Sequence, residues 1–174
     1  MIANEAPIKT QCLILEPLLV AHASALYHGL CSPELYCYTD DEAPPSLEWL
    51  HARYARLERR TSPDGLTGWL NWAIWSMEGA RYVGYVQATV PAPGSEAEIA
   101  YVLFLADWGK GYAREAVTAM VAVLIESRGV SSFVARTSPG NIRSNALLES
   151  LGFSRAALPD PGSGDVLWHL AKRR

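Results

Sequence analysis

A short turn with two glycines, residues 108–114 (Trp-Gly-Lys-Gly-Tyr-Ala-Arg), is the stretch of this chain best suited to bind an anion. Glycine lets the backbone take conformations that a side chain forbids and lets it approach a ligand closely. The amphipathic segment that follows would present unpaired N–H groups and the positive end of a helix dipole, which favours a diphosphate. Lys110 and Arg114 add positive charge. The glycine pair alone also fits a plain strand-to-helix turn with a solvated lysine.

Two other phosphate-binding motifs do not fit this turn. The dinucleotide fingerprint needs glycine or alanine three residues after Gly111, where this chain has Arg114. The nucleoside-triphosphate loop needs Gly-Lys followed by Ser or Thr, and the chain has no such string. Both motifs are therefore excluded.

The turn lies inside a strand, helix, strand unit. Residues 99–105 are β-branched, aromatic and otherwise apolar, which suits a strand buried on both faces. Over 113–128 the apolar residues recur at helical spacing, and Gly129 stands where a left-handed C-cap would lie. A second strand is expected over 130–136.

The remaining segments predict a mixed α/β architecture. Gly84 indicates a bulge or a close backbone approach in its strand. The order of elements predicts a mainly antiparallel sheet with one right-handed β-α-β crossover. Strands are expected over 10–15, 69–76, 82–90, 153–158 and 165–171, and helices over 18–30, 46–60 and 141–152.

Composition bounds the class of protein. The chain has 174 residues, 49% of them hydrophobic and 19% charged, so we expect one globular domain over 1–174. A net charge of −3 argues against a general nucleic-acid binder. Three cysteines in no paired spacing favour reduced thiols, and the chain shows no signal peptide and no apolar stretch of membrane-spanning length. A cytoplasmic location is expected.

A polar connection before residue 45 is a candidate site for an amine. Tyr36 and Tyr38 are followed by Asp40, Asp41 and Glu42, and carboxylates beside aromatic rings attract a cation. A solvated acidic loop fits the same residues equally well. We interpret Trp72 first as a core and sheet-face residue and second, with Tyr36, as a wall of an acceptor pocket.

The arginines and histidines of the chain indicate a function less clearly. Arg53, Arg56, Arg59 and Arg60 form a basic edge on the helix expected over 46–60, which we interpret first as solvated and second as a phosphate or RNA contact. The four histidines are scattered without metal-ligand spacing, so no metal is expected.

Residues 98–116 resemble motif A of the GCN5-related N-acetyltransferase (GNAT) superfamily, whose core pattern is Gln/Arg-x-x-Gly-x-Gly/Ala. Gly111 and Ala113 stand at the last two fixed positions of that pattern. Trp108 stands at the Gln/Arg position, a departure that resembles the branch of ribosomal-protein N-terminal (RimJ/RimL-type) acetyltransferases. Residues 141–153 are similar to motif B of the same family, in the expected order and at the expected separation.

The resemblance implies a GNAT fold, in which two central parallel strands splay into a V and acetyl-coenzyme A (acetyl-CoA) enters the gap. It implies that the backbone of residues 102–104 pairs with pantetheine and that the N–H groups of 109–113 hold the diphosphate. Asn141 and Ser144 would face the pantetheine arm and the thioester. The expected cofactor-binding residues are Val102, Leu103, Phe104, Trp108, Gly109, Lys110, Gly111, Tyr112, Ala113, Arg114, Asn141 and Ser144.

The implied reaction is attack of an uncharged amine on the thioester carbonyl, which requires a base to remove a proton. Glu98, on the strand that enters the site, is the candidate base, and a plain solvent-facing carboxylate is its other interpretation. Backbone N–H groups near Leu103 would polarise the carbonyl oxygen. Many family members carry a tyrosine acid where this chain has Leu148, so Ser144 would instead hydrogen-bond the departing sulfur. The expected catalytic residues are Glu98, Ser144 and Asn141.

Two hypotheses from different classes follow. The first is an enzyme that moves acetyl from acetyl-CoA to a protein N-terminal α-amine or a small-molecule amine. The second is a non-catalytic acyl-CoA-binding or regulatory module with the same fold. The acidic segment favours a cationic acceptor, whereas the arginine edge favours an acidic or RNA-bearing one. No membrane and no direct nucleic-acid partner is expected, and a homodimer is expected from family habit alone.

Overall fold

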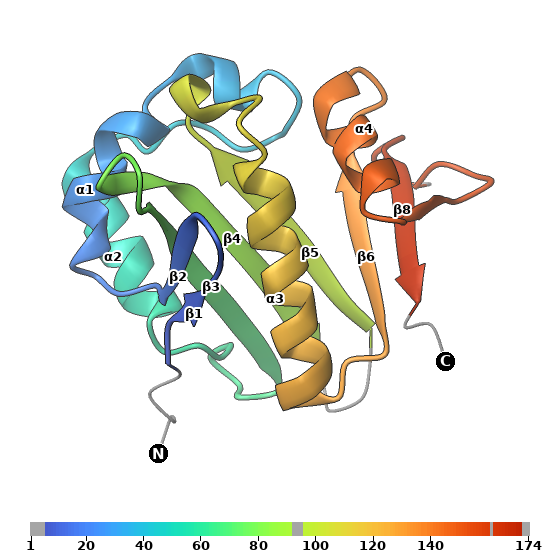
Figure 1. Ribbon diagram of the computed structural model, residues 1–174, viewed down its shortest axis with the longest axis horizontal. Coiled ribbons are helices and arrows are strands. Elements are labelled where there is room, and N and C mark those ends of the chain that lie inside the picture. The colour runs from blue at the N-terminus through green and yellow to red at the C-terminus, as the bar shows by residue number, and fades with distance from the viewer. Residues whose placement is uncertain (1–5, 92–95, 161, 172–174) are drawn as a thin grey trace.

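The computed structural model of the protein describes residues 6–91, 96–160 and 162–171. The described residues form a sheet of eight strands in the order β1-β2-β3-β4-β5-β6-β8-β7 (Figure 1). Only β5 and β6 pair in parallel, and every other described pair is antiparallel, which confirms the predicted α/β class with its single parallel unit. The strands are β1 (Ile8–Lys9), β2 (Leu13–Pro17), β3 (Thr67–Ser76), β4 (Arg81–Pro91), β5 (Glu96–Leu103), β6 (Ser132–Thr137), β7 (Ser154–Arg155) and β8 (Val166–Ala171).

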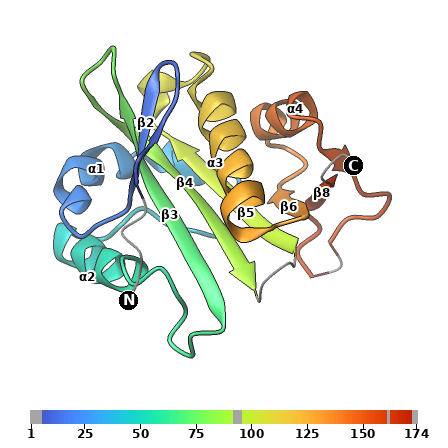
Figure 2. The ribbon, with the colours of Figure 1, turned by 60° about the horizontal axis from the view of Figure 1, so that its bottom comes forward.

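Helices cover both faces of the sheet. In Figures 1 and 2, α3 and α4 lie on one face, and α1 and α2 lie on the other. None of the helices in the described part of the chain is long and apolar enough to cross a membrane. The helices are α1 (His22–Leu30), α2 (Leu47–Leu57), α3 (Tyr112–Arg128) and α4 (Ile142–Ser150), with short 3₁₀ turns η1 (Pro33–Tyr36) and η2 (Leu105–Asp107).

The predicted helix over 18–30 begins later than expected. The Leu18 N–H donates to the carbonyl of Asn71 at 2.9 Å, so this residue still follows the edge of the sheet, and α1 begins only at His22. The predicted strand over 153–158 shrinks to the two residues of β7. Hydrophobic pattern locates these elements, whereas hydrogen bonds to distant residues decide where they end.

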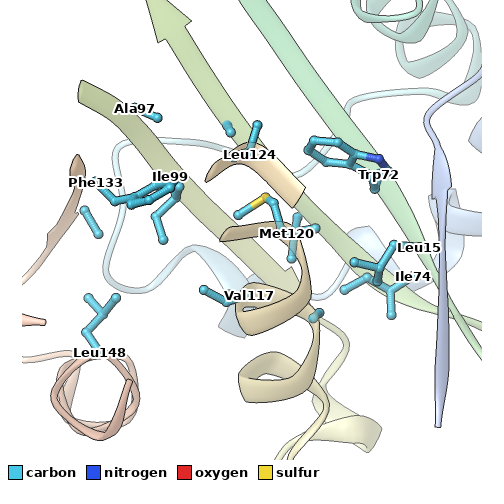
Figure 3. Close-up of a cluster of buried hydrophobic side chains, with 14 of the residues drawn as sticks. Leu15, Trp72, Ile74, Ala97, Ile99, Val117, Met120, Leu124, Phe133 and Leu148 are labelled. Atoms are coloured by element: carbon cyan, nitrogen blue, oxygen red, sulfur yellow. The ribbon is translucent and has the colours of Figure 1, made fainter. Parts of the chain in front are cut away.

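The main core lies between α3 and the sheet. Leu15, Trp72, Ile99, Met120 and Phe133 come from four strands and α3 and are at most 2% exposed (Figure 3). A second cluster fills the opposite face, where α1 and α2 contribute Leu26, Leu50 and Tyr54. Alternate residues of the central strands therefore serve two different cores, which accounts for their nearly continuous apolar sequence.

The parallel pair of β5 and β6 is short. Its register runs from Glu96 with Ser132 to Glu98 with Val134 and stops there, although both strands continue. From Glu98 onward β5 is paired with β4, as far as Gly84 with Leu103. The two central strands therefore diverge after Glu98, as the V-shaped arrangement requires.

Gly84 lies at a bulge in β4, as the sequence predicts. The register slips at Ile74 and Trp75 of β3, which leaves Val83 as the extra residue on β4. Gly84 has φ +149°, and a Cβ built there would lie 2.0 Å from the carbonyl oxygen of Val102. Only glycine permits this backbone approach, so the bulge fixes how closely β4 contacts the part of β5 that leaves β6.

The first turn of α3 is tied to the start of the chain. The Thr10 hydroxyl donates to Glu115 Oε1 at 2.5 Å, and the Cys12 N–H donates to the same oxygen at 2.6 Å. At its other end, α3 stops at Gly129, which is left-handed with φ +65°. The helix predicted over 113–128 is thus confirmed, with one more residue at its start.

Arg60 departs from the predicted basic edge. Its side chain is buried, its Nη1 donates to the Asn71 carbonyl at 3.1 Å, and its guanidinium lies 4.9 Å from the Trp72 ring centre. The expectation of a solvated face is therefore wrong for Arg60, because a guanidinium can be buried where a carbonyl and an aromatic face receive it.

Candidate active site

The diverging edge of β5 presents backbone groups to the space between β5 and β6. The Phe104 N–H donates to the Val83 carbonyl at 2.9 Å and so points toward β4. Because successive backbone groups of a strand point to opposite edges, Val102 also faces β4, whereas Tyr101 and Leu103 face the side of β6. Of the residues predicted to pair with pantetheine, the structure thus turns Leu103 toward the diverging side and engages Phe104 with β4. Tyr101 was not predicted there.

The glycine turn has an open, uncapped geometry. Gly109 and Gly111 are left-handed, with φ +77° and +83°, and a Cβ on either would meet no atom within 4 Å. Gly111 is the N-cap of α3, and no side chain caps the helix there. The N–H groups of this turn and the helix dipole therefore face open space, which fits the diphosphate of a nucleotide cofactor.

A buried carboxylate next to this turn accepts a hydrogen bond from one of its residues. Asp107 is 2% exposed, and it accepts from Arg81 Nη1 at 2.8 Å, from Arg81 Nη2 at 2.6 Å and from Lys110 Nζ at 2.9 Å. Burial alone would raise the pKa of Asp107, but the hydrogen bonds and charges of the two cations outweigh it and lower the pKa. Lys110, predicted as a phosphate ligand, is thus partly committed to Asp107. Sequence reasoning missed Asp107 because an aspartate in a turn is usually solvated.

Trp108 connects the turn to both sides of the diverging strands. Its Nε1 donates to the Leu103 carbonyl at 2.8 Å, and the guanidinium of Arg143 on α4 lies 4.3 Å from its ring centre. A cation over an indole face is attractive, so this contact spans from the turn before α3 to the first turn of α4. Arg143 was not predicted, and nothing in its local sequence indicates this partner. Arg114, in the first turn of α3, is exposed.

The predicted residues of α4 lie at its N-terminus. Asn141 is the N-cap and accepts from the Ser144 N–H at 3.2 Å. The Tyr101 hydroxyl donates to the Ser144 carbonyl at 3.4 Å, which joins β5 to α4. Leu148 is fully buried in the main core, so the position that carries a tyrosine in many family members is here a packing position.

Glu98 is part of an ion-paired group at the last position where β5 pairs with β6. Its carboxylate accepts from Arg136 Nη1, and Arg136 Nε donates to Asp160 at 2.7 Å. Hydrogen bonds and charge from Glu98 and Asp160 raise the pKa of Arg136, so the guanidinium stays charged. Glu98 and Arg136 lie on the sheet face that α1 and α2 cover farther along, and both side chains are partly exposed.

A cavity of about 390 Å³ lies on that same face, between the α1–α2 connection, α2 and strands β3 and β4. Tyr36, Asp40 and Asp41, all predicted as acceptor residues, line it. Gln87 and Tyr85 form part of its lining and pair with Ala100 and Val102 of β5. Because neighbouring strands are ~4.8 Å apart, the cavity lies one strand from the diverging part of β5.

Two predicted acceptor residues lie elsewhere. Trp72 is 1% exposed in the main core and stands next to the cavity-lining Asn71 in β3, so its side chain points to the opposite face of the sheet. It does not line the cavity, which corrects its placement as a wall of the acceptor pocket. Tyr38 is half exposed, and its ring lies 3.2 Å from a Cβ built on Gly140, in the turn before α4.

Comparison with known proteins agrees with this geometry. A family model described as an acetyltransferase (GNAT) domain matches residues 13–154. The diverging parallel pair and the uncapped glycine turn lie within that range, and the chain belongs to the GNAT acetyltransferase family. It is therefore an acyltransferase, as the first hypothesis predicts. A search of curated protein sequences gives no significant match.

Solved acetyltransferase structures share the fold. RimL, a ribosomal L7/L12 α-N-protein acetyltransferase in complex with coenzyme A, superposes with a TM-score of 0.79 at 17% identity, over 95% of this chain and 98% of that one. A GNAT-family acetyltransferase from Bacillus anthracis gives 0.77 at 16% identity over 95% and 98%, and one from Agrobacterium tumefaciens gives 0.75 at 21% over 97% and 95%. At these identities the likeness concerns the fold alone.

Proposed function

We propose that this protein transfers an acetyl group from acetyl-CoA to a primary amine by direct attack within a ternary complex. The observation that carries the proposal is the continuity of two features: an unpaired edge of β5 that ends at Leu103, and an uncapped glycine turn that begins at Trp108. A pantetheine arm offers amide groups for such an edge, and a diphosphate fits such a turn.

In this proposal, the glycine turn and α4 contact different parts of acetyl-CoA. The N–H groups of residues 109–113 hold the diphosphate, while Lys110 and Arg114 supply positive charge around it. The outward N–H and carbonyl of Tyr101 pair with the pantetheine amides, because the Leu103 carbonyl already accepts from Trp108 Nε1. The first turn of α4, with Asn141 and Ser144, lies on the other side of the arm. Acetyl-CoA itself supplies the activated acetyl thioester.

The remaining groups serve the acyl transfer. The amine nitrogen first forms a bond to the carbonyl carbon, which gives a tetrahedral intermediate whose oxyanion needs a hydrogen-bond donor. The carbon–sulfur bond then breaks, and coenzyme A leaves as the thiolate. The Leu103 N–H, on the edge away from β4, is that donor in our proposal. The Ser144 hydroxyl stabilises the departing sulfur, and Glu98 accepts the proton of the amine through water while Arg136 holds its carboxylate in place.

Calorimetric titration of the protein with acetyl-CoA tests the co-substrate site, with Gly111→Trp as the disrupting variant. Gly65→Trp is a matched control, because Gly65 has nearly the same backbone (φ +74°) and equally open space but lies in the loop before β3. We expect Gly111→Trp to weaken binding by about 100-fold or more, since it loses the left-handed backbone and fills the diphosphate space. Equal affinities of both variants and the wild type would refute the assigned site.

Turnover is measured separately, as amine-dependent release of free thiol. Glu98→Gln and Ser144→Ala should lower kcat while leaving the dissociation constant of acetyl-CoA within about twofold, because neither holds the diphosphate in our proposal. Unchanged kcat in Glu98→Gln would remove Glu98 from the proton path and leave the cofactor site intact.

A further inference from the structure

The cavity on the α1 and α2 face combines an acidic entrance with an apolar interior. Asp40, Asp41 and Glu42 are exposed where they line it, whereas Leu18 and Leu50 are buried in its walls. No hydrogen bond or ion pair within the described residues engages the three carboxylates. A volume of about 390 Å³ is in the range of pockets that hold small molecules.

A buried hydroxyl in the same lining lacks a partner. Tyr54 is 3% exposed, and its hydroxyl makes no hydrogen bond with the described part of the chain. An unpaired buried polar group is unfavourable unless a ligand or water completes it. Burial raises the pKa of Tyr54 far above its usual range, so the hydroxyl remains neutral during any reaction near neutral pH. The cavity therefore contains a hydrogen-bonding position that the chain itself leaves open.

The lining of the cavity is acidic overall. Asp40, Asp41 and Glu42 outnumber Arg53, which leaves the lining with a formal charge of −2. Arg53 belongs to α2 and lies 5.5 Å from the ring centre of Trp49, so its guanidinium already has an aromatic neighbour. An occupant with more than one positive charge complements this lining, whereas an anionic occupant meets three carboxylates at the entrance.

We propose that the acceptor is a polybasic aliphatic amine, which carries a second, non-reacting ammonium group bound by Asp40, Asp41 and Glu42 at the entrance of the cavity. The proposal rests on the acetyl transfer argued above and names its substrate class. The apolar chain of the amine packs against Leu18 and Leu50 in the cavity walls. The Tyr54 hydroxyl forms a hydrogen bond with the nitrogen at the inner end of that chain. The reacting nitrogen lies toward Gln87 and Tyr85, one strand from the diverging edge of β5.

Four acceptors test this assignment by thiol release: pentane-1,5-diamine, 5-aminopentanol, hexylamine and 6-aminohexanoate. Each joins a primary amine through five methylene groups to a far group, which is an ammonium, a hydroxyl, a methyl group or a carboxylate. The two equivalent amines of the diamine account for a factor of two at most. We expect kcat/KM for the diamine to exceed those of the others by about tenfold or more, as for a charge-assisted contact. A preference for 6-aminohexanoate would show that Arg53 selects an anionic end and would overturn the proposal.

The triple variant D40N/D41N/E42Q should abolish the preference for the diamine over 5-aminopentanol while the affinity for acetyl-CoA stays the same. A control that removes three carboxylates elsewhere, Glu126→Gln, Glu149→Gln and Asp165→Asn, should keep the preference, because it lowers net negative charge without changing the cavity. Equal loss in both triple variants would reduce the effect to general electrostatic attraction and overturn the site.

Tyr54→Phe separates a binding role from a structural one. Removal of an unpaired buried hydroxyl should leave the melting temperature of the free protein unchanged or raised, yet raise KM for the diamine by about three- to tenfold. A lowered melting temperature with unchanged KM would show that the hydroxyl serves folding alone. If no amine releases thiol although acetyl-CoA binds, the proposed transfer fails as well, and that result is distinct from equal use of the four amines.

Discussion

Replacement of Asp107 by asparagine tests the physical basis of the glycine turn. Asparagine keeps the shape of the side chain but loses the charge that receives Arg81 and Lys110. A hydrogen bond to a charged group contributes about 1.5–3 kcal/mol, and three such bonds meet at this carboxylate. The two cations are 45% and 46% exposed, so water receives them again in the variant and most of the loss is recovered.

We therefore expect Asp107→Asn to lower the free energy of unfolding by about 2–3 kcal/mol, less than removal of one partner from a fully buried pair. Urea unfolding of both proteins gives the difference. The affinity for acetyl-CoA should fall about three- to tenfold, because Lys110 and the turn beside it lose their anchor. Arg81→Met and the double variant complete a cycle whose coupling energy should be about 1 kcal/mol or more.

The stabilisation that the Asp107 carboxylate contributes depends on pH. The pKa of Asp107 in the folded protein is lowered from its ordinary value of 3.8, so the ionised carboxylate stabilises the fold at and above neutral pH. That contribution is lost as the pH falls through the folded pKa. The stability difference between wild type and Asp107→Asn should thus be constant near neutral pH and shrink below about pH 4. A difference under about 0.5 kcal/mol, or one that persists unchanged in acid, would refute the reasoning.

Two further predictions concern the scaffold. Gly84→Ala should lower the free energy of unfolding by about 3 kcal/mol or more, because its Cβ would lie 2.0 Å from the Val102 carbonyl oxygen. The control Gly65→Ala, where the space is open, should lower it by only about 1 kcal/mol. Comparable losses for the two variants in urea unfolding would contradict the close approach at Gly84. Burial and the neighbouring Glu115 carboxylate raise the pKa of Cys12, so iodoacetamide should label Cys12 more slowly than the exposed Cys37 at mildly alkaline pH. Peptide mass mapping over time measures both rates. Faster labelling of Cys12 would contradict this prediction.

The sequence predicts the central unit of the fold because local and global signals agree there. The helical period over 113–128, the glycines at both of its ends and the apolar strand before it all indicate one strand, helix and strand unit, which is the unit observed. The end of β5 is less predictable. Its pairing with β6 stops at Glu98, and no local pattern in the sequence marks that position.

The candidate site can be predicted only in part, because several of its contacts join residues that are distant in the sequence. Asp107 and Arg143 act through partners on other elements, and neither sequence neighbourhood distinguishes them from solvated residues. Trp72 lies in the core, as its first interpretation predicts, and only its second interpretation as a pocket wall is wrong. Arg60 leaves the solvated edge because its guanidinium contacts the Trp72 ring. Side-chain direction in a strand depends on a single residue of register, so a pattern with apolar residues on both faces leaves it undetermined.

The tie between Glu115 and the first hairpin has a consequence for the order of assembly. Thr10 leaves the ribosome 105 residues before its partner, so the start of the chain waits for most of the protein to be synthesised before this contact forms. The antiparallel strands β2, β3 and β4 close on shorter loops, and loop-closure entropy favours their earlier pairing. The first turn of α3, which would receive the diphosphate, thus acquires its anchor late, and nascent chains that end before residue 115 contain neither the helix nor the anchored turn.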